Sequence, residues 1–331
     1  MPLYLTEDEV GRLLPMPACI EAVEQAFRQW AEGRASNRPR ARATLRGGML
    51  HSLSAASDDW GRMAAKVYAT TRAGARFVVL LFDGRTSDLI AIIEADRLGQ
   101  IRTGAASGVA TRHLARPDAT TLAVIGTGWQ ARGQVLAIAS VRTIRTVRVF
   151  GRDRDRLLAF CREVEAAAGL PVTAAPSIEA AVRGADIVAT ATNSASPIVQ
   201  GSWIEPGTHL NAVGSNRIDR RELDLSVLDR AATIVVDSIE QARLEAGDFV
   251  AATPGGGAGT VTGGAGSGPP AMPVLDRAVE LAAVVSGRVP GRRRPEDITL
   301  FKSLGIGLED LAAAQLVYDR AVAEQAGRVI P

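Results

Sequence analysis

The spacing of apolar residues changes character along the chain, and the first third combines helical and extended patterns. Between residues 16 and 32, apolar residues recur at spacings of three and four, which predicts an amphipathic helix. Residues 38–93 favour strands, because apolar runs such as 77–82 and 89–94 are separated by turn signals. Residues 99–114 return to a helical pattern. A further helix is predicted over residues 308–326, near the end of the chain.

From Thr120 onward, short apolar strands alternate with helices. The predicted strands cover residues 122–125, 147–150, 171–173, 187–190, 209–213 and 233–237. The predicted helices cover residues 129–140, 153–168 and 177–183. This alternation is typical of an α/β protein with a parallel, doubly wound sheet, since each parallel connection needs a crossover. Residues 254–270 are too rich in glycine to support a packed element, and we expect a surface loop there.

Composition and charge exclude several classes of protein. A chain of 331 residues has room for about two domains. The net charge of +2, without a long run of like charge, argues against a nucleic-acid partner. No apolar stretch is long enough for a membrane span and no signal peptide is evident, so the expected compartment is the cytoplasm. Two distant cysteines and three scattered histidines offer no metal-binding spacing, and no metal is expected.

A glycine motif follows the predicted strand 122–125 and opens the predicted helix that comes next. Gly126 would permit the tight turn, Gly128 would let the backbone approach a pyrophosphate, and Ala131 would keep the helix close to the strand. The amide groups at the helix N-terminus would bind the phosphates. The predicted dinucleotide contacts in this turn are Gly126, Thr127, Gly128, Trp129, Gln130 and Ala131.

The end of the second strand of this domain bears on the choice of cofactor. A site for NAD usually places a carboxylate there, against the ribose hydroxyls. Here Gly151 and Arg152 follow the strand, and Arg152 lies where a 2′-phosphate could bind. We therefore expect NADPH, with NADH as the alternative because Asp153 is only one residue further on.

Several segments together resemble the ornithine cyclodeaminase/μ-crystallin family. They are Lys66 in Ala-Ala-Lys-Val-Tyr, the segments 101–106 and 126–131, 212–216 with Arg221-Glu222-Leu223, and 301–305 with Glu309-Asp310-Leu311. The resemblance implies a homodimer whose Rossmann domain, residues 119–303, is inserted into a smaller α+β domain. That second domain, residues 1–118 plus 304–331, would bind substrate and mediate dimerisation. Further cofactor contacts are expected at Thr103, Thr192, Asn193, Val213, Gly214, Ser215, Ser303 and Leu304.

The resemblance also implies a small amino, keto or imino acid substrate, bound in a cleft between the domains. Its carboxylate would be held by Lys66, Arg102 and either Arg40 or Arg42, between which the sequence does not decide. Guanidinium groups fit a carboxylate well because they offer two parallel donors. Lys66 is the expected catalytic residue, as proton donor or electrostatic partner, since neighbouring arginines would lower its pKa toward neutrality. His51 is a weaker candidate for contact with the substrate.

One departure from the family pattern narrows the chemistry. Ornithine cyclodeaminases carry an Asp where this chain has Asn216, and an amide cannot act as a general base. We therefore predict reduction of Δ1-pyrroline-2-carboxylate and Δ1-piperideine-2-carboxylate to L-proline and L-pipecolate, with Asn216 among the substrate contacts. The alternatives are an ornithine cyclodeaminase or an alanine dehydrogenase-like enzyme, and a non-catalytic, μ-crystallin-like protein that binds NADP and a small ligand.

Overall fold

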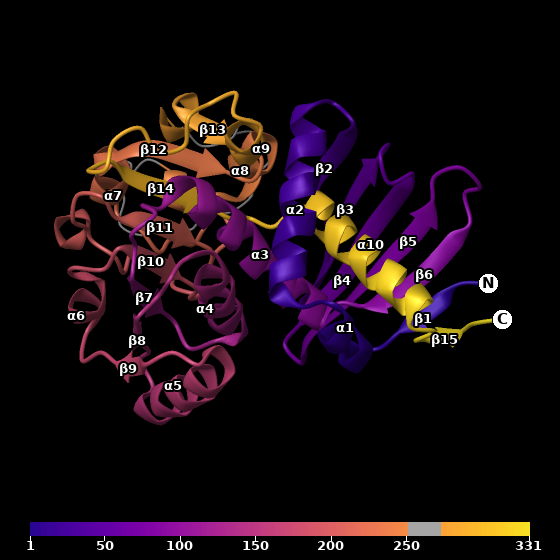
Figure 1. The fold of residues 1–331 in the computed structure, drawn as a ribbon, viewed down its shortest axis with the longest axis horizontal. Helices are drawn as coiled ribbons and strands as arrows, with labels where there is room; N and C mark the ends of the chain where they lie inside the picture. The colour runs from indigo at the N-terminus through magenta and orange to yellow at the C-terminus, as the bar shows by residue number, and fades with distance from the viewer. Residues whose placement is uncertain (251–272) are drawn as a thin grey trace. The chain divides into compact units, whose positions relative to one another are not determined.

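The computed structural model describes residues 1–250 and 273–331, and its contacts divide the chain into two compact units (Figure 1). Unit 1 contains Met1–Val109 and Gly305–Pro331, and unit 2 contains Ala110–Leu304. The first division falls inside a helix rather than after residue 118, and the second falls one residue beyond the predicted boundary. The predicted glycine-rich loop, residues 254–270, lies outside the described residues.

Unit 1 is built on a seven-stranded sheet in the order β15-β1-β6-β5-β4-β3-β2. The strands are β1 (Leu3–Leu5), β2 (Ala35–Leu45), β3 (Gly48–Ser57), β4 (Arg62–Thr71), β5 (Gly74–Asp83), β6 (Leu89–Glu94) and β15 (Arg328–Val329). The pairing is antiparallel except between β1 and β6. The strands predicted between residues 38 and 93 are present, whereas the short edge strands β1 and β15 carried no period-2 pattern long enough to predict.

Three helices pack in unit 1: α1 (Glu7–Leu13), α2 (Met16–Ala31) and α10 (Gly307–Ala323). Thr6 and Glu9 form a capping box at the start of α1. Helix α10 contacts α2 and strands β2 to β5, which brings the end of the chain onto the first sheet. A fourth helix, α3 (Asp96–Leu114), begins in unit 1 and ends in unit 2.

Unit 2 is built on an eight-stranded, wholly parallel sheet in the order β13-β12-β14-β11-β10-β7-β8-β9. The strands are β7 (Thr121–Ile125), β8 (Thr146–Phe150), β9 (Val172–Ala174), β10 (Ile187–Thr190), β11 (His209–Ala212), β12 (Ala231–Val236), β13 (Ala278–Glu280) and β14 (Ile298–Lys302). Strands β8 and β10 lie on opposite sides of β7, so the strand order reverses at β7. Ligands bind at such a reversal point in open α/β sheets.

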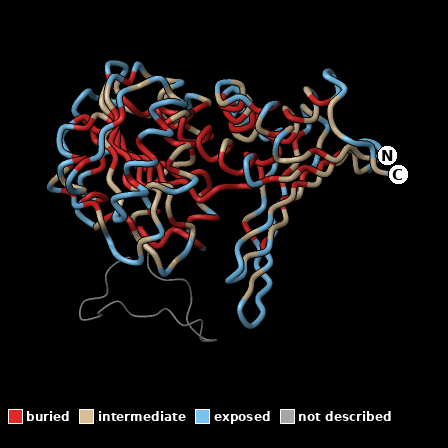
Figure 2. The backbone as a smooth tube through the Cα atoms, turned by 90° about the horizontal axis from the view of Figure 1, so that it is seen from below, coloured by how far each residue is buried: buried red, intermediate tan, exposed pale blue. Residues whose placement is uncertain are grey.

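Helices cover both faces of this sheet, as the doubly wound pattern predicts. They are α4 (Trp129–Val141), α5 (Arg154–Ala168), α6 (Ile178–Val182), α7 (Leu225–Arg230), α8 (Ile239–Glu245) and α9 (Leu281–Val285). Alternate residues of β7 enter opposite cores: Leu122 and Val124 pack with α4 and α5, and Ala123 and Ile125 pack with α6 to α8. Strands β10, β11 and β14 are buried throughout, including polar residues such as His209, Asn211 and Lys302. Figure 2 shows buried backbone running through the interior of the unit.

Strand β14 is the main feature of the sheet that the pattern did not predict. It inserts between β11 and β12 although it is the last strand of the unit in sequence. Its sequence, Ile-Thr-Leu-Phe-Lys, ends on a lysine and showed no clear apolar run. None of the helices in the described part of the chain is long and apolar enough to cross a bilayer.

Candidate active site

The predicted phosphate-binding turn joins β7 to α4 in unit 2. Gly126 has φ +120°, and an added Cβ there would collide with the carbonyl oxygen of Ala191. Glycine is therefore required, since an L residue would be strained as well as obstructed. At Gly128, the N-cap of α4, an added Cβ would meet only open space, so the turn leaves room in front of the helix. The free amide groups of the helix N-terminus thus face a space in which an anion can bind.

A cavity of about 590 Å³ extends from this turn along the carboxyl ends of the parallel strands. Its lining includes most of the predicted cofactor residues: Gly126, Thr127, Gly128, Trp129, Gln130, Gly151, Arg152, Thr192, Asn193, Val213 and Gly214. A cavity of this volume is typical of cofactor sites. The lining residues follow the ends of β7, β8, β10 and β11, on both sides of the phosphate turn, where a dinucleotide can bind.

Five predicted cofactor residues do not line this cavity. Ala131 is fully buried in the core between α4 and the sheet, where it can only hold the helix close. Thr103 belongs to unit 1 and donates a hydrogen bond to the carbonyl of Gly99. Ser215, Ser303 and Leu304 are buried in unit 2, where the amide of Ser303 binds the carbonyl of Ala212. These five cofactor contacts therefore stay predictions.

Two arginines and one aspartate line the cavity beyond the end of β8. They are Arg152, Asp153 and Arg156, of which the sequence had singled out the first two. The Asp153 carboxylate is the N-cap of α5 and accepts a hydrogen bond from the amide of Arg156 at 3.0 Å. One carboxylate oxygen is therefore committed to the helix, while the two guanidinium groups give this end of the cavity an excess of positive charge. Arg156 could have been found from the sequence, because it lies in the first turn of the predicted helix 153–168, next to Arg152 and Asp153.

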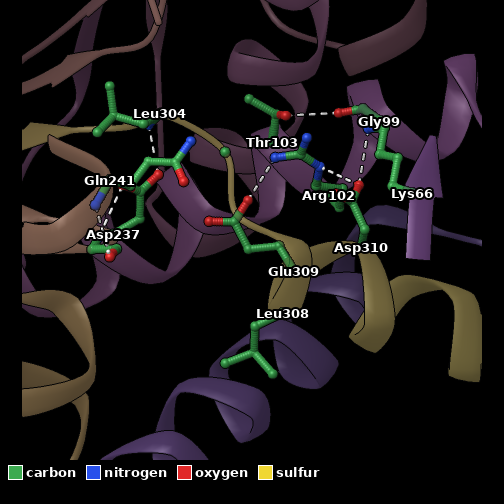
Figure 3. Close-up of polar contacts among 12 residues, drawn as sticks. Lys66, Gly99, Arg102, Thr103, Asp237, Gln241, Leu304, Leu308, Glu309 and Asp310 are labelled. Carbon is green, nitrogen blue, oxygen red and sulfur yellow. Dashed lines mark hydrogen bonds and ion pairs between the residues drawn. The ribbon is translucent and has the colours of Figure 1, made fainter. Parts of the chain in front are cut away.

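In unit 1, a buried cluster of charged groups gathers around the predicted carboxylate ligands. Lys66 of β4 lies 3.0 Å from Asp310 of α10, and Arg102 of α3 donates to the same carboxylate oxygen at 2.8 Å (Figure 3). Arg102 also binds Glu309 at 2.7 Å. Burial of such groups is costly unless they are paired, and here each has a partner of opposite charge. In the sequence, Glu309 and Asp310 stand out only as part of a family motif, and their role as partners of Lys66 and Arg102 comes from the structure.

The structure distinguishes Arg40 from Arg42. Arg40 is buried and donates to the carbonyl of Gly305 at 2.9 Å, whereas Arg42 is exposed opposite His51 on β3. Gly305 has φ +75°, and a Cβ there would lie 2.6 Å from a guanidinium nitrogen of Arg102. Gly305 therefore lies between Arg40 and Arg102, and a residue with a Cβ would not fit there. Because the two residues are two positions apart on β2, strand alternation does not separate them, and the sequence did not reveal that Arg40 is the buried one.

The charges of the cluster do not cancel. Arg40, Lys66 and Arg102 contribute three positive charges, and Glu309 and Asp310 contribute two negative ones, which leaves a formal charge of +1 among these groups. Burial lowers the pKa of Lys66 to about 8, with Arg102 and Arg40 acting in the same direction and Asp310 opposing them. Lys66 is therefore mostly protonated at neutral pH and loses its proton near pH 8. Such a cluster can accept one carboxylate.

An aromatic row lies beside Lys66 on the same sheet. His51, Tyr68 and Phe77 are directly opposite one another on β3, β4 and β5, with ring centroids 4.1 Å and 4.9 Å apart. The Nζ of Lys66 lies 5.9 Å from the centroid of Tyr68 and 5.5 Å from that of Phe77. Burial and the nearby arginines lower the pKa of His51 to about 4, so His51 is uncharged at neutral pH. Cross-strand register, which the sequence did not specify, places Tyr68 and Phe77 here.

Asn216 and Asp219 follow β11 in unit 2. Asn216 is partly buried and does not line the cavity. Asp219 is exposed and forms a bidentate ion pair with Arg217, at 2.7 Å and 2.8 Å, which lowers the pKa of Asp219. Asp219 is thus fully ionised and engaged at the surface, which does not suit it to replace the missing cyclodeaminase aspartate. Among the residues described, no cluster of three or more His, Cys, Asp or Glu could hold a metal ion.

Comparison with known proteins identifies the family. The model of the ornithine cyclodeaminase/mu-crystallin family matches residues 2–325. The chain belongs to this family. It is 36% identical over 253 residues to a Δ1-pyrroline-2-carboxylate reductase of Bacillus cereus, covering 76% of this chain and 73% of the relative. It is 35% identical to the ketimine reductase mu-crystallin of Mus musculus, covering 73% of this chain and 68% of that protein.

Solved structures of the family have the same fold. The Δ1-pyrroline-2-carboxylate reductase of Thermococcus litoralis, in complex with NADH and L-proline, superposes with a TM-score of 0.88 and 31% identity over 99% of this chain and 100% of that chain. An archaeal alanine dehydrogenase dimer with bound NAD also gives a TM-score of 0.88, with 30% identity over 100% of this chain and 99% of that chain. The predicted family, the α/β fold class and the assignment as an oxidoreductase are thereby confirmed.

Proposed function

We propose that the protein reduces a cyclic ketimine acid, Δ1-pyrroline-2-carboxylate or Δ1-piperideine-2-carboxylate, to L-proline or L-pipecolate with NADPH. The observation that carries this proposal is the burial of three cationic side chains, Arg40, Lys66 and Arg102, in one cluster where Lys66 and Arg102 share the Asp310 carboxylate. A substrate carboxylate would bind to these cations. The names of the Bacillus, mouse and Thermococcus relatives support the same chemistry.

Each residue of the cluster would have a distinct role. Arg102 is held by two carboxylates, so its guanidinium orientation is fixed before substrate binds. Arg40 would complete the clamp on the substrate carboxylate. Lys66 would supply a proton to the imine nitrogen, because an acid whose pKa is about 8 transfers protons efficiently near neutral pH. Asp310 would keep the Lys66 side chain in place.

The aromatic row would supply an apolar surface for the ring of the substrate. Tyr68 and Phe77 lie within 6 Å of the Lys66 ammonium, so a ring whose imine nitrogen approached Lys66 could pack on them. His51 is uncharged at neutral pH and would contribute shape rather than a proton. We propose that His51 is a substrate contact in this limited sense.

When bound in the cavity of unit 2, the nicotinamide cofactor would deliver a hydride to the imine carbon while the nitrogen gains a proton. Arg152 and Arg156 favour NADPH, because two guanidinium groups at the end of β8 can bind a 2′-phosphate. The Asp153 carboxylate is engaged in capping α5, which weakens the case for a carboxylate that binds the ribose of NADH. The Thermococcus relative was solved with NADH, which is the alternative cofactor for this chain.

A second candidate is reductive amination of an α-keto acid, as in alanine dehydrogenase. The archaeal alanine dehydrogenase matches the whole chain with a TM-score of 0.88, and the same cation cluster would suit a keto acid. The two activities differ in their need for ammonia, because a preformed cyclic imine already contains the nitrogen. The dimer described for that relative also supports a homodimer for this protein.

The deciding experiment follows NADPH oxidation at 340 nm with each cyclic imine and with pyruvate, in the presence and absence of ammonia. The proposal predicts turnover of the imines without ammonia and little turnover of pyruvate. Turnover that depends strictly on ammonia would favour the alanine dehydrogenase-like alternative. Tight NADPH binding without turnover of any acid would indicate a binding protein like the μ-crystallin alternative.

A further inference from the structure

A second buried charge network lies in unit 2 and involves motifs to which no role has yet been assigned. It contains Glu222, from Arg221-Glu222-Leu223, Lys302, from Phe301-Lys302-Ser303, and Asp248. All three side chains are completely buried. Lys302 is one of only two lysines among the 38 basic residues of the chain. Buried ionic groups with satisfied partners can specify local geometry.

Glu222 joins the ends of two neighbouring strands. Its Oε1 accepts a hydrogen bond from the amide of Thr192, just after β10, at 2.7 Å. Its Oε2 accepts from the amide of Gly214, just after β11, at 2.7 Å, and from the hydroxyl of Thr190 at 2.8 Å. Thr192 and Gly214 both line the cofactor cavity. One carboxylate therefore sets the spacing of two segments of the cavity wall.

The residues around the contact between Glu222 and Gly214 are closely packed. A Cβ added at Gly214 would collide with the backbone of Thr192 and with the Glu222 carboxylate. Behind Glu222, Asp248 accepts hydrogen bonds from the amides of Glu222 at 2.6 Å and Leu223 at 3.0 Å. Lys302 lies 2.8 Å from Asp248 and donates to the carbonyl of Ser215 at 2.7 Å. The network thus fixes both the segment that carries Glu222 and the segment that follows β11.

Strand order indicates which half of the cofactor this wall would contact. The phosphate turn follows β7, and the arginines that suit the adenosine phosphate follow β8, on one side of β7. Strands β10 and β11 lie on the other side of β7. A dinucleotide whose pyrophosphate binds at the turn would therefore extend its nicotinamide half over the ends of β10 and β11.

We propose that Glu222 is a positioning residue for the nicotinamide half of the cofactor, acting through the amides of Thr192 and Gly214. This inference rests on the proposed nicotinamide cofactor. A carboxylate is needed because both of its oxygens accept hydrogen bonds from backbone donors. In Glu222→Gln the side-chain NH₂ must face either the Thr192 amide or the Gly214 amide, and a donor facing a donor makes no bond. One of the two segments would therefore shift.

The test compares binding of NADPH with binding of 2′,5′-ADP, which lacks the nicotinamide half, by calorimetry on the full chain. Glu222→Gln should weaken NADPH binding roughly tenfold or more, because one of the two cavity segments would no longer be held in place. Its affinity for 2′,5′-ADP should stay within about twofold. If the wild type prefers NADH, the pair becomes NADH and 5′-ADP. Glu245→Gln, a buried glutamate of the same unit that does not line the cavity, is the matched control and should change neither affinity.

Equal losses for both ligands, or no loss for either, would overturn the positioning role. Thr190→Val offers a milder second test if Glu222→Gln does not fold, since it removes only the hydroxyl that donates to Glu222 at 2.8 Å and should give a smaller loss that is again selective for NADPH. Failure of the wild type to bind either nicotinamide cofactor would instead contradict the proposed function. The two failures are therefore distinguishable.

Discussion

The only two lysines of the chain lie in two buried charge networks of opposite balance, one in each unit. Around Lys66, three cations meet two carboxylates, so the formal charge is +1. Around Lys302, one cation meets the carboxylates of Glu222 and Asp248, so the formal charge is −1. Lys302 is 0% exposed and Lys66 is 4% exposed, so burial does not distinguish them.

The difference lies in how each excess charge is compensated. In unit 2, backbone amides of Thr192, Gly214, Glu222 and Leu223 donate to the two carboxylates, so the excess negative charge is already solvated by the protein. In unit 1, the excess is positive, and the groups that could offset it include the carboxylate of a ligand. We therefore infer that the Lys302 network stabilises the structure and that the Lys66 network binds a ligand, although their residue types are alike.

The largest expected effect is on catalysis in Lys66→Met. Loss of the proposed proton donor should lower kcat/KM for the cyclic imine by about 10²- to 10⁴-fold. Asp310 would keep Arg102 as a partner at 2.8 Å, so the apparent Tm should change by only a few degrees. Steady-state kinetics and differential scanning fluorimetry measure the two effects. Near-normal kinetics in the folded variant would remove Lys66 from the mechanism.

Lys302→Met should show the opposite pattern. The substitution leaves Glu222 and Asp248 buried without a counter-charge, and breaking a buried ion pair in this way costs about 3–5 kcal/mol. For a unit of this size the apparent Tm should fall by roughly 10 °C, which a thermal scan beside Lys66→Met would detect. A Tm equal to that of the wild type would contradict the structural role of this network.

Arg156→Ala addresses the positive end of the cofactor cavity. If Arg156 binds a 2′-phosphate, KM for NADPH should rise about 10-fold or more while KM for NADH stays nearly constant, because one charge-assisted hydrogen bond is worth about 1.5–3 kcal/mol. Asp153→Asn is a suitable control, since asparagine also caps helices and neither KM should change much. A parallel rise in both KM values would argue against recognition of the phosphate.

The smallest effect is a pH dependence. Because burial lowers the pKa of Lys66 to about 8, the ammonium is present below that pH and is lost above it. The groups around it are Asp310 and Glu309 of α10, Arg102 of α3 and Arg40 of β2, and the arginines stay charged throughout. Accordingly kcat/KM should decline above about pH 8, by up to tenfold per pH unit. Lys66→Arg, whatever its rate, should lack this decline; retention of it would assign the titration to another group.

The sequence predicted those features that depend on local pattern. The turn at Gly126 and Gly128, the helix after it and the alternating strands of unit 2 are encoded in consecutive residues, and the structure contains them. The resemblance to the family predicts that Lys66 and Arg102 share a site, and in the structure both contact Asp310. Strand β14 was not predicted, because a short segment ending in lysine gives no periodic signal.

Features that depend on distant segments were not accessible in this way. Arg40 differs from Arg42 because it is buried against the distant Gly305, and the aromatic row depends on the register of three strands. The network of Glu222, Asp248 and Lys302 joins three segments that are far apart in sequence. Nothing in the local pattern of any one segment indicates its partners.

The most direct test of the carboxylate clamp is an NMR titration of the protein labelled with ¹³C at the lysine ε-carbons. With two lysines the spectrum should contain two signals, which Lys66→Arg assigns. The Lys66 signal should titrate near pH 8 in the free protein and at higher pH with L-proline bound, because an adjacent carboxylate stabilises the ammonium. A Lys66 titration unchanged by saturating L-proline or L-pipecolate would contradict it.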